Sequence, residues 1–499
     1  MAEFAKSFLT YSVILFVFLI GVLLAVLLVI YLIDVTQKEH TVRRNYPVIG
    51  RFRYLFEHLG EFFRQYFFAM DREEMPFNRA QRSWVYRAAK NVDSTVAFGS
   101  TRDLRPVGTI MFVNAPFPPT SDESLPPKPV TIGEGYCANP FKTSALINIS
   151  GMSFGAISKP AVRALSHGAK KAGCWLNTGE GGLSPYHLEG GCDIVFQIGT
   201  GKFGVRDTDG GLCDVKLAKI ASHDAVKLFE VKLSQGAKPG KGGMLPAEKV
   251  TQEIAEIRGL KVGQAAISPN RHQETNNNEE LLEFIMRIRK VTAKPTGFKA
   301  VISSELWLDE LFSLINQKGV EWAPDFISVD SCDGGTGAAP MSLMDDMGMP
   351  VKESLPLLID KLKQYGLRDR IKVNASGKMI NPTEVAWAMC MGTDFVSTAR
   401  GPMFALGCIQ ALQCNKNTCP TGITTHDNDL QKGLVVENKQ KRVAYYLKNL
   451  EKEIRIIANS CGVKRPRDLN RGHARVMVSH GKSKTLEELY PSVSPRSEN

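Results

Sequence analysis

The longest apolar segment of the chain lies close to its N-terminus. No charged residue occurs between Lys6 and Asp34, and the run is dense in Phe, Val, Leu and Ile. It is longer than the roughly 20 residues that an α-helix needs to cross a bilayer. The pattern therefore predicts one transmembrane helix over residues 7–33. A buried core helix is the alternative, whereas a cleaved signal peptide would have a shorter apolar run and a small-residue cleavage site.

Basic residues flank this segment unevenly. Lys6 precedes it, whereas five basic residues follow it closely: Lys38, Arg43, Arg44, Arg51 and Arg53. The positive-inside rule predicts from this asymmetry that the rest of the chain faces the cytoplasm. We therefore expect a single-pass membrane protein whose ten cysteines lie in a reducing compartment and are too sparse for a disulfide scaffold.

Aromatic and charged residues are interleaved between Arg53 and Phe68. This pattern is typical of an amphipathic helix at a membrane interface, and it fits equally well a helix packed against a soluble domain. Residues 114–129 are rich in proline, which is typical of an extended connector. We therefore assign residues 34–129 to a membrane-proximal and connector region.

From residue 130 onward, short apolar runs alternate with segments of helical character. The runs are Ala145–Ile149, Phe229–Leu233, Gln264–Ile267, Gly297–Ile302, Phe326–Val329, Ile371–Val373 and Phe395–Ser397. Such alternation predicts β-strands joined by helices. Several of the runs end in glycine-rich or charged loops, and loops at strand ends build the active sites of (β/α)8 barrels. We predict an α/β fold with a (β/α)8 TIM-like barrel over residues 130–432; a doubly wound open sheet is the alternative. Residues 433–481 are predicted to be a helical segment, and the polar residues 482–499 a disordered tail.

Composition narrows the functional classes. The chain has 499 residues, of which 43% are hydrophobic and 23% charged, as in ordinary globular proteins. A net charge of +11 suits an anionic substrate, a membrane surface or nucleic acid. Basic and aromatic residues are not interleaved outside the membrane-proximal region, so we expect no nucleic acid partner. Patterns for a Ser-His-Asp triad, HExxH or a Walker A loop do not occur.

Three cysteines stand close together near the end of the predicted barrel. Cys408, Cys414 and Cys419 are spaced by five and four residues, and Pro420 follows the third. Compact cysteine runs that end in Cys-Pro favour an iron–sulfur cluster, and three ligands suggest a three-iron cluster. A zinc site completed by His426 and unliganded structural cysteines are the alternatives.

Glycine-rich segments follow the last two predicted strands. They are Asn374–Lys378 and Thr398–Pro402, and they suit the phosphate of a flavin mononucleotide, although two ordinary turns would look similar. The GxGxxG match at Gly199–Gly204 is interpreted as a loop, because turn residues rather than a helix follow it. Glu180 is a carboxylate among glycines, which fits either proton handling or a tight turn.

Together these segments resemble the FMN-binding glutamate synthase family, specifically its synthase domain, over about residues 144–432. The resemblance is carried by the cysteine spacing and by four motifs: Gly151–Ser158, Asn177–Gly182, Gln235–Gly240 and Asp333–Ala338. It implies a barrel that binds FMN and a 3Fe-4S cluster. It also implies condensation of 2-oxoglutarate with ammonia to 2-iminoglutarate, which flavin then reduces to L-glutamate.

The resemblance also assigns residues to roles. Cys408, Cys414 and Cys419 match the cluster ligands, and Lys299 matches the lysine beside the flavin ring. Lys299 and, from its place among glycines, Glu180 are the expected catalytic residues. Gln235, Lys238 and Arg258 fall where 2-oxoglutarate is bound. The residues expected to contact FMN are Ser153, Asp333, Gly334, Gly335, Thr336, Gly337, Gly377 and Gly401.

Departures from the family pattern shape the functional expectation. The chain opens with Met1-Ala2, so we expect no amidotransferase cysteine. We expect ammonia to be used directly or received from a partner, and electrons to come from a donor protein. Lys202, Lys241 and Met244 replace residues usual in the family beside the substrate. Two alternatives therefore stand beside glutamate formation: an FMN and iron–sulfur oxidoreductase for a different amine or 2-oxo acid, and a non-catalytic electron-transfer subunit of a membrane complex.

Overall fold

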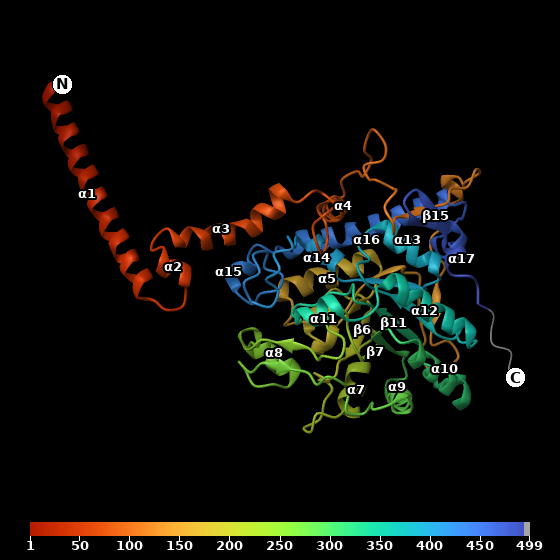
Figure 1. Ribbon diagram of the computed structural model, residues 1–499. Coiled ribbons are helices and arrows are strands. Elements are labelled where there is room, and N and C mark those ends of the chain that lie inside the picture. The colour runs from red at the N-terminus through yellow and green to blue at the C-terminus, as the bar shows by residue number, and fades with distance from the viewer. Residues whose placement is uncertain (494–499) are drawn as a thin grey trace. The chain divides into compact units, whose positions relative to one another are not determined.

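The computed structural model describes residues 1–493, except for the side chains of residues 61 and 62. The chain divides into two compact units, Met1–Gln81 and Arg82–Asn499. Figure 1 shows the course of the chain.

The first unit is helical. Helix α1 (Ala2–Thr36) has a mean hydropathy of 3.6 in its most apolar window and is long and apolar enough to cross a membrane. It is followed by α2 (Thr41–Asn45), α3 (Gly50–Phe63) and a π-helical turn, η1 (Arg64–Phe68). The prediction of one apolar helix of membrane-spanning length is confirmed.

The second unit contains a closed barrel of eight parallel strands. Their order around the barrel is β10-β11-β12-β13-β4-β5-β6-β7. The strands are β4 (Ile147–Ile149), β5 (Leu176–Asn177), β6 (Ile194–Ile198), β7 (Val226–Lys232), β10 (Thr296–Val301), β11 (Phe326–Asp330), β12 (Lys372–Ala375) and β13 (Phe395–Thr398). This arrangement confirms the (β/α)8 barrel and excludes the open sheet.

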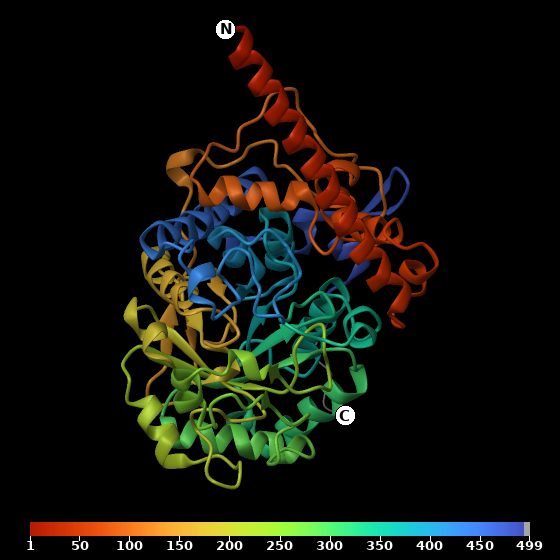
Figure 2. The same ribbon diagram turned by 90° about the vertical axis from the view of Figure 1, so that its left-hand side faces the viewer.

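Helices surround the barrel strands (Figure 2). In chain order they are α5 (Lys159–Ala172), α6 (Pro185–Glu189), α7 (Asp214–Ala221), α8 (Gln252–Arg258), α9 (Asn278–Thr292), α10 (Glu305–Lys318), α11 (Met341–Asp346), α12 (Val351–Gln364), α13 (Pro382–Met391) and α14 (Arg400–Leu406). Helix α5 shows how the sequence sets these elements. The Ser158 hydroxyl accepts a hydrogen bond from the Ala161 amide at its start, and Gly173 adopts a left-handed conformation at its end.

The predicted strands differ from the structure in two ways. The run Gln264–Ile267 contributes β9 (Ala266–Ile267), which pairs with β8 (Met244–Leu245) in a separate two-stranded sheet rather than in the barrel. Conversely, β5 and β6 belong to the barrel but were not among the predicted runs. β5 is only two residues long, which is too short to give a recognisable hydrophobic pattern.

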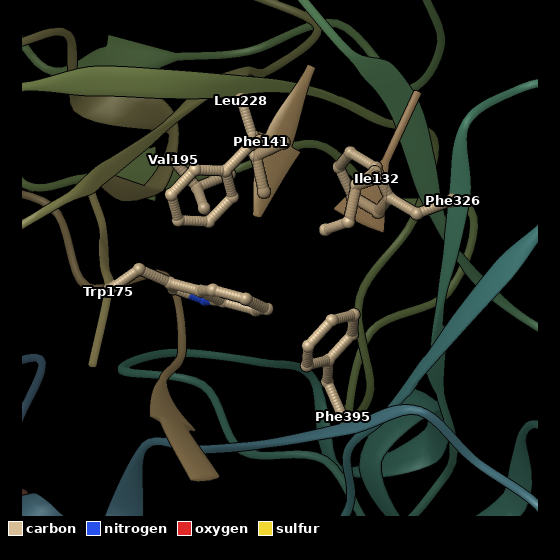
Figure 3. Close-up of a cluster of buried hydrophobic side chains, with 7 residues drawn as sticks. All are labelled: Ile132, Phe141, Trp175, Val195, Leu228, Phe326 and Phe395. Carbon is tan, nitrogen blue, oxygen red and sulfur yellow. The ribbon is translucent and has the colours of Figure 1, made fainter. Parts of the chain in front are cut away.

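The N-terminal end of the barrel is closed by a hydrophobic cluster, shown in Figure 3. The hairpin of β2 (Val130–Ile132) and β3 (Phe141–Thr143) contributes Ile132 and Phe141 to it. The other members lie at or near the starts of barrel strands: Trp175, Val195, Leu228, Phe326 and Phe395. Because this end is filled by apolar side chains, polar chemistry is left to the opposite end, where the strands terminate.

The C-terminal part corrects two expectations. Residues 433–481 do contain a long helix, α16 (Val436–Ser460), which packs against α5, but they also contain β14 (Ala474–Ser479), paired with β1 (Ile110–Phe112). Residues 482–489 form β15 (Lys482–Thr485) and α17 (Leu486–Leu489) instead of a disordered tail. This polar segment is ordered by three features: pairing of β15 with β14, a capping box of Thr485 and Glu488, and burial of Leu486. Residues 494–499 of the predicted tail lie outside the described residues.

Candidate active site

The predicted site residues gather at the carboxyl ends of the barrel strands. Ser153 follows β4, Glu180 follows β5, Gln235 and Lys238 follow β7, Lys299 lies in β10, Asp333–Gly337 follow β11, Gly377 follows β12, and Gly401 follows β13. In a closed parallel barrel these positions share one face. The face is opposite the end that the hydrophobic cluster closes.

Two buried lysine–carboxylate pairs occupy this face. The Nζ of Lys232 lies 3.0 Å from Oε1 of Glu180, and the Nζ of Lys299 lies 2.9 Å from Oδ2 of Asp330. Lys232 and Lys299 are register partners in the parallel pair of β7 and β10. The two ammonium groups therefore rise from neighbouring strands, each beside its own counter-charge.

The carboxyl of Glu180 is held in its ionised form. Burial disfavours the charge, but the positive charges of Lys232, Lys238 and Arg258 outweigh it and lower the pKa of Glu180. The side chain fits closely between two glycines: a Cβ on Gly199 or on Gly243 would collide with it. An ionised, tightly held carboxylate at this place can accept a proton.

Lys299 is held in its charged form by similar means. Burial lowers the pKa of this lysine, but the charges of Asp330 and Glu230 more than compensate, so the pKa of Lys299 is raised. In the same way burial raises the pKa of Asp330, yet the charge of Lys299 lowers it below its ordinary value. The pair thus places a permanent positive charge at the end of β10.

Arg258, Lys238 and Gln235 lie around Glu180. Arg258 is 4% exposed and donates from Nη2 to Ser153 Oγ at 3.3 Å and to the Phe154 carbonyl at 3.0 Å, while its buried Nε has no hydrogen-bond partner. Burial lowers the pKa of Arg258 to about 10, and it also lowers the pKa of Lys238, aided by the charge of Lys232. Gln235 Oε1 accepts a hydrogen bond from Lys232. This set is rich in buried positive charge and suits a small anion.

The loops after β11 and β12 form a narrow cradle. A Cβ on Gly334 would collide with Oδ1 of Asp330 and would lie 2.7 Å from the Cα of Gly236. Gly377 has a φ of 124°, and a Cβ there would lie 2.5 Å from the hydroxyl of Ser331. That hydroxyl is buried without a hydrogen-bond partner. A cradle with an unpaired buried donor is a suitable place for a ligand oxygen.

Charged side chains border this cradle. Arg400 donates to the Asp333 carbonyl, and its Cδ would lie 3.1 Å from a Cβ on Gly335. The Nζ of Lys378 lies 3.7 Å from Oδ1 of Asp333. Gly337 stands apart, since a Cβ there would meet nothing within 4 Å, and Thr336 donates to the Ala338 carbonyl at 3.2 Å. Gly401 packs against Tyr446, whose hydroxyl a Cβ would strike.

Below the face, a polar network crosses the inside of the barrel. Glu230 accepts hydrogen bonds from Asn177 (2.8 Å), Gln197 (2.6 Å) and Ser328 (2.6 Å). Ser328 in turn accepts one from Asn374 at 2.9 Å. The network joins β5, β6, β7, β11 and β12 and separates the site from the hydrophobic cluster.

Sequence reasoning did not single out Lys232, Glu230 or Asp330. A signal for the first two exists within the predicted strand: Glu230 and Lys232 alternate with Phe229 and Val231, so they share one face of the strand. Charged residues on one face of an otherwise apolar barrel strand indicate a polar interior. Asp330 gave no comparable signal, because it is a single charged residue directly after the predicted run Phe326–Val329 and shows no alternation.

The three predicted cluster cysteines lie near one another, beside a buried lysine. Burial raises the pKa of Cys408 to about 12 and also raises that of Cys414, and each is affected by the charges of the neighbouring thiols. Burial opposes ionisation of Cys419 too, but hydrogen bonds from Thr421 and Thr424 outweigh it and lower its pKa. In the part of the chain that the structure describes, no three His, Cys, Asp or Glu side chains are grouped so as to hold a metal ion.

Lys249 is the cation beside these thiols. It is 2% exposed, and its Nζ donates to the carbonyls of Cys414 and Thr424, both at 2.6 Å. Burial lowers the pKa of Lys249, and the charges of Cys414 and Cys419 offset this only in part. Among the described residues no carboxylate lies within ion-pair distance of it. The cysteine loop thus carries a buried positive charge that lacks an acidic side chain as partner.

A cavity of about 1080 Å³ lies apart from the predicted site residues. It is lined by residues near the start of α9 and along α10, among them His272, Asn277 and Trp307. None of the predicted site residues lines it. The strand-end face, rather than this cavity, is therefore the candidate active site.

Comparisons with known proteins bear on the family of the chain. Residues 119–464 match the family described as "Conserved region in glutamate synthase". The glutamate synthase large subunit-like protein YerD of Bacillus subtilis (strain 168) is 39% identical over 521 residues, which cover 96% of this chain and 98% of that protein. The archaeal-type glutamate synthase (NADPH) of Thermotoga sp. (strain RQ2) is 32% identical over 343 residues, 68% of this chain and 64% of that protein. Among solved structures, mandelate oxidase with (S)-4-hydroxymandelic acid is similar with a TM-score of 0.48 and 13% identity, covering 80% of this chain and 99% of that one.

Proposed function

This chain belongs to the glutamate synthase family and is an oxidoreductase, and we propose that it forms L-glutamate from 2-oxoglutarate, ammonia and electrons delivered by a donor protein. The overall change combines 2-oxoglutarate, ammonium, two electrons and two protons into glutamate and water. The observation that carries the proposal is the set of buried cations around an ionised Glu180 at the end of the barrel.

The residues present fit FMN as the cofactor. The cradle of Gly334 and Gly377 would be filled by any side chain, and the Ser331 hydroxyl beside it lacks a partner. Ser153, Asp333–Gly337, Gly377 and Lys378 would hold FMN there, with Arg400 and Gly401 at the end of β13. When bound, FMN supplies the hydride that reduces the imine. Lys299, kept charged by Asp330, stabilises negative charge beside the reacting ring.

The substrate is bound by the remaining cations. Arg258 and Lys238 bind the two carboxylates of 2-oxoglutarate, and Gln235 donates to its carbonyl oxygen. Because both cations are buried, they exclude water and fix the orientation of the reacting carbon. Binding of an anion also favours the charged form of Lys238, whose pKa is otherwise lowered by burial.

Glu180 handles the proton. As an ionised carboxylate paired with Lys232, it accepts a proton from the nitrogen once ammonia has added to the carbonyl carbon, and returns that proton to the oxygen that leaves as water. Water is then lost and 2-iminoglutarate forms at the same place. Lys232 holds the carboxylate in position during this step.

The cysteine loop fits a 3Fe-4S cluster by its donor chemistry. Cys408, Cys414 and Cys419 are soft ligands that favour iron–sulfur clusters, and an anionic cluster would supply the counter-charge that Lys249 lacks. Such a cluster supplies an entry point for single electrons from a donor protein. We include in the proposal that the three thiols close around the cluster when it is bound.

Membrane attachment completes the proposal. We propose that helix α1 spans the membrane once and that the barrel faces the cytoplasm, an orientation that the basic residues after α1 support. The exposed apolar side chains along α1 support this role, because they would otherwise face water.

The proposal is tested with detergent-purified protein made under iron-replete conditions. FMN is identified by acid extraction, and the cluster by anaerobic EPR. Glutamate is then measured after addition of 2-oxoglutarate, ammonium and a low-potential reductant. Formation of glutamate supports the proposal. Reduction of a different 2-oxo acid or amine instead would contradict 2-oxoglutarate as substrate, and cofactor spectra without any product would favour an electron-transfer subunit.

A further inference from the structure

The end of α1 and the start of α3 are joined by an ion pair whose carboxylate is buried. Asp34 is 1% exposed and accepts hydrogen bonds from Arg51 Nη2 at 2.8 Å, from Arg51 Nε at 2.9 Å and from the Val48 amide at 3.0 Å. The hydrogen bonds of Arg51 lower the pKa of Asp34, so the carboxylate keeps its charge. Helix α3 therefore begins beside the point where the apolar run of α1 ends.

Helix α3 and η1 carry an exposed apolar stripe. Phe52, Phe56, Leu59, Phe63 and Phe67 follow one another at intervals of three or four residues, which is the spacing of one helix face, and Ile49 continues the spacing just before α3 begins. Ile49, Phe56 and Phe67 are 73%, 65% and 73% exposed. The rings pair along the stripe, with centroids 6.5 Å apart for Phe52 and Phe56 and 5.5 Å apart for Phe63 and Phe67.

Basic residues flank the stripe. Arg51, Arg53 and Arg64 are distributed along α3 and η1, and Arg43 of α2 lies over the ring of Tyr54 at 4.7 Å. A helix with an aromatic face and basic flanks has the composition of helices that lie in the headgroup layer of a phospholipid membrane.

We propose that α3 and η1 lie in the headgroup layer of the leaflet from which α1 emerges, with the stripe turned toward the acyl chains. This inference rests on the membrane attachment proposed above and extends it to a second element. The Asp34–Arg51 pair supplies the reason for choosing lipid as the partner: it holds the first turn of α3 at the level where a spanning α1 leaves the bilayer. At about 1.5 Å per residue, α3 covers about 21 Å along the surface.

The experiment uses full-length protein in phosphatidylcholine and phosphatidylglycerol vesicles that contain brominated lipids, which quench nearby indoles. Three variants are compared with the parent protein: Phe56→Trp in the stripe, Phe18→Trp in the middle of α1, and Phe117→Trp, at an exposed phenylalanine of the second unit. The fluorescence of the five native tryptophans is removed by subtracting the spectrum of the parent protein. Phe52→Trp replaces Phe56→Trp if the latter does not fold.

We expect lipids brominated near the headgroup to quench F56W severalfold more than F117W, and lipids brominated deep in the acyl chains to quench F18W. If F18W is quenched but F56W responds only to aqueous iodide, or to neither quencher, the interfacial position of α3 is wrong while the membrane span stands. If F18W itself is not quenched, the proposed span fails first and the position of α3 fails with it.

Discussion

The Nζ of Lys299 lies 2.9 Å from Oδ2 of Asp330, and both side chains are almost completely buried. Each group shifts the pKa of the other toward the charged form, which burial alone would oppose. The positive charge at the end of β10 is therefore built into the barrel, independently of any ligand. Removing either partner would leave the other as an unpaired buried charge.

Lys299→Met tests this charge. We expect kcat to fall about 10²- to 10³-fold, because the group that stabilises developing negative charge is lost. Asp330→Asn should lower kcat less while bringing the alkaline limb of the pH profile to lower pH, since Lys299 loses the charge that raises its pKa. Lys352→Met, at a half-buried lysine of α12, is the control. Equal activity of K299M and K352M would contradict the role of Lys299.

Gly334 and Gly337 give a matched pair within one motif. A Cβ on Gly334 would collide with Asp330 and approach the Cα of Gly236, whereas a Cβ on Gly337 would meet nothing within 4 Å. We expect Gly334→Ala to weaken flavin binding at least tenfold and Gly337→Ala to leave it unchanged. Flavin content after dialysis and the fluorescence of released flavin measure this. A G334A protein with full flavin content would refute the cradle.

The pH dependence of substrate binding follows from Lys238. Burial, with the charge of Lys232, lowers its pKa, so this lysine loses its proton at a lower pH than an ordinary lysine. Raising the pH should therefore reduce kcat/KM for 2-oxoglutarate, mainly through KM. Lys238→Arg should move this alkaline limb to higher pH, and a profile identical to that of the parent protein would contradict the assignment.

The sequence predicted the barrel and most of the residues at its strand ends, here called the rim, because both produce local sequence patterns. Apolar runs that end in glycine-rich loops indicated the strand ends, and the glycine motifs lie where that pattern predicted. The partners of the rim residues were not predictable, because Glu180 meets Lys232 across 52 residues of chain and Lys249 meets Cys414 across 165 residues. Such contacts depend on closure of the barrel and on the loop after β7, which no local pattern encodes.

The same limit explains the errors. Gln264–Ile267 has the composition of a barrel strand, but its pairing with β8 is decided by the loop that carries both. The tail beginning at Lys482 has the composition of a disordered segment, yet strand pairing with β14 orders it. Hydrogen bonds between distant segments decided both cases.

Acid should destabilise the protein through His187. This histidine is buried, and burial lowers its pKa from 6.5 to about 4. Between these values the unfolded chain binds a proton that the native protein does not, so the free energy of unfolding falls as the pH falls, by up to about 3 kcal/mol. His187→Gln should reduce this dependence, and the exposed His223→Gln should not. Unfolding midpoints from pH 7 to 4 measure it, and equal slopes for both variants would contradict the prediction.

The cysteine loop gives the last prediction. Cys414→Ser should remove iron from the purified protein and leave its flavin, because one of three ligands is lost while the strand-end face is untouched. Cys213→Ser, at the start of α7, is the control and should keep both.

Lys249→Met extends the test, since it removes the cation and leaves the carbonyls of Cys414 and Thr424 without their donor. We expect this variant to lose iron and to have a free energy of unfolding lower by about 1–3 kcal/mol. Lys249→Arg should retain part of the iron and part of the stability. Iron that stays bound in C414S would show that these cysteines are not the ligands. Iron lost from C414S but fully retained in K249M would show that the cluster does not need the lysine as its counter-charge.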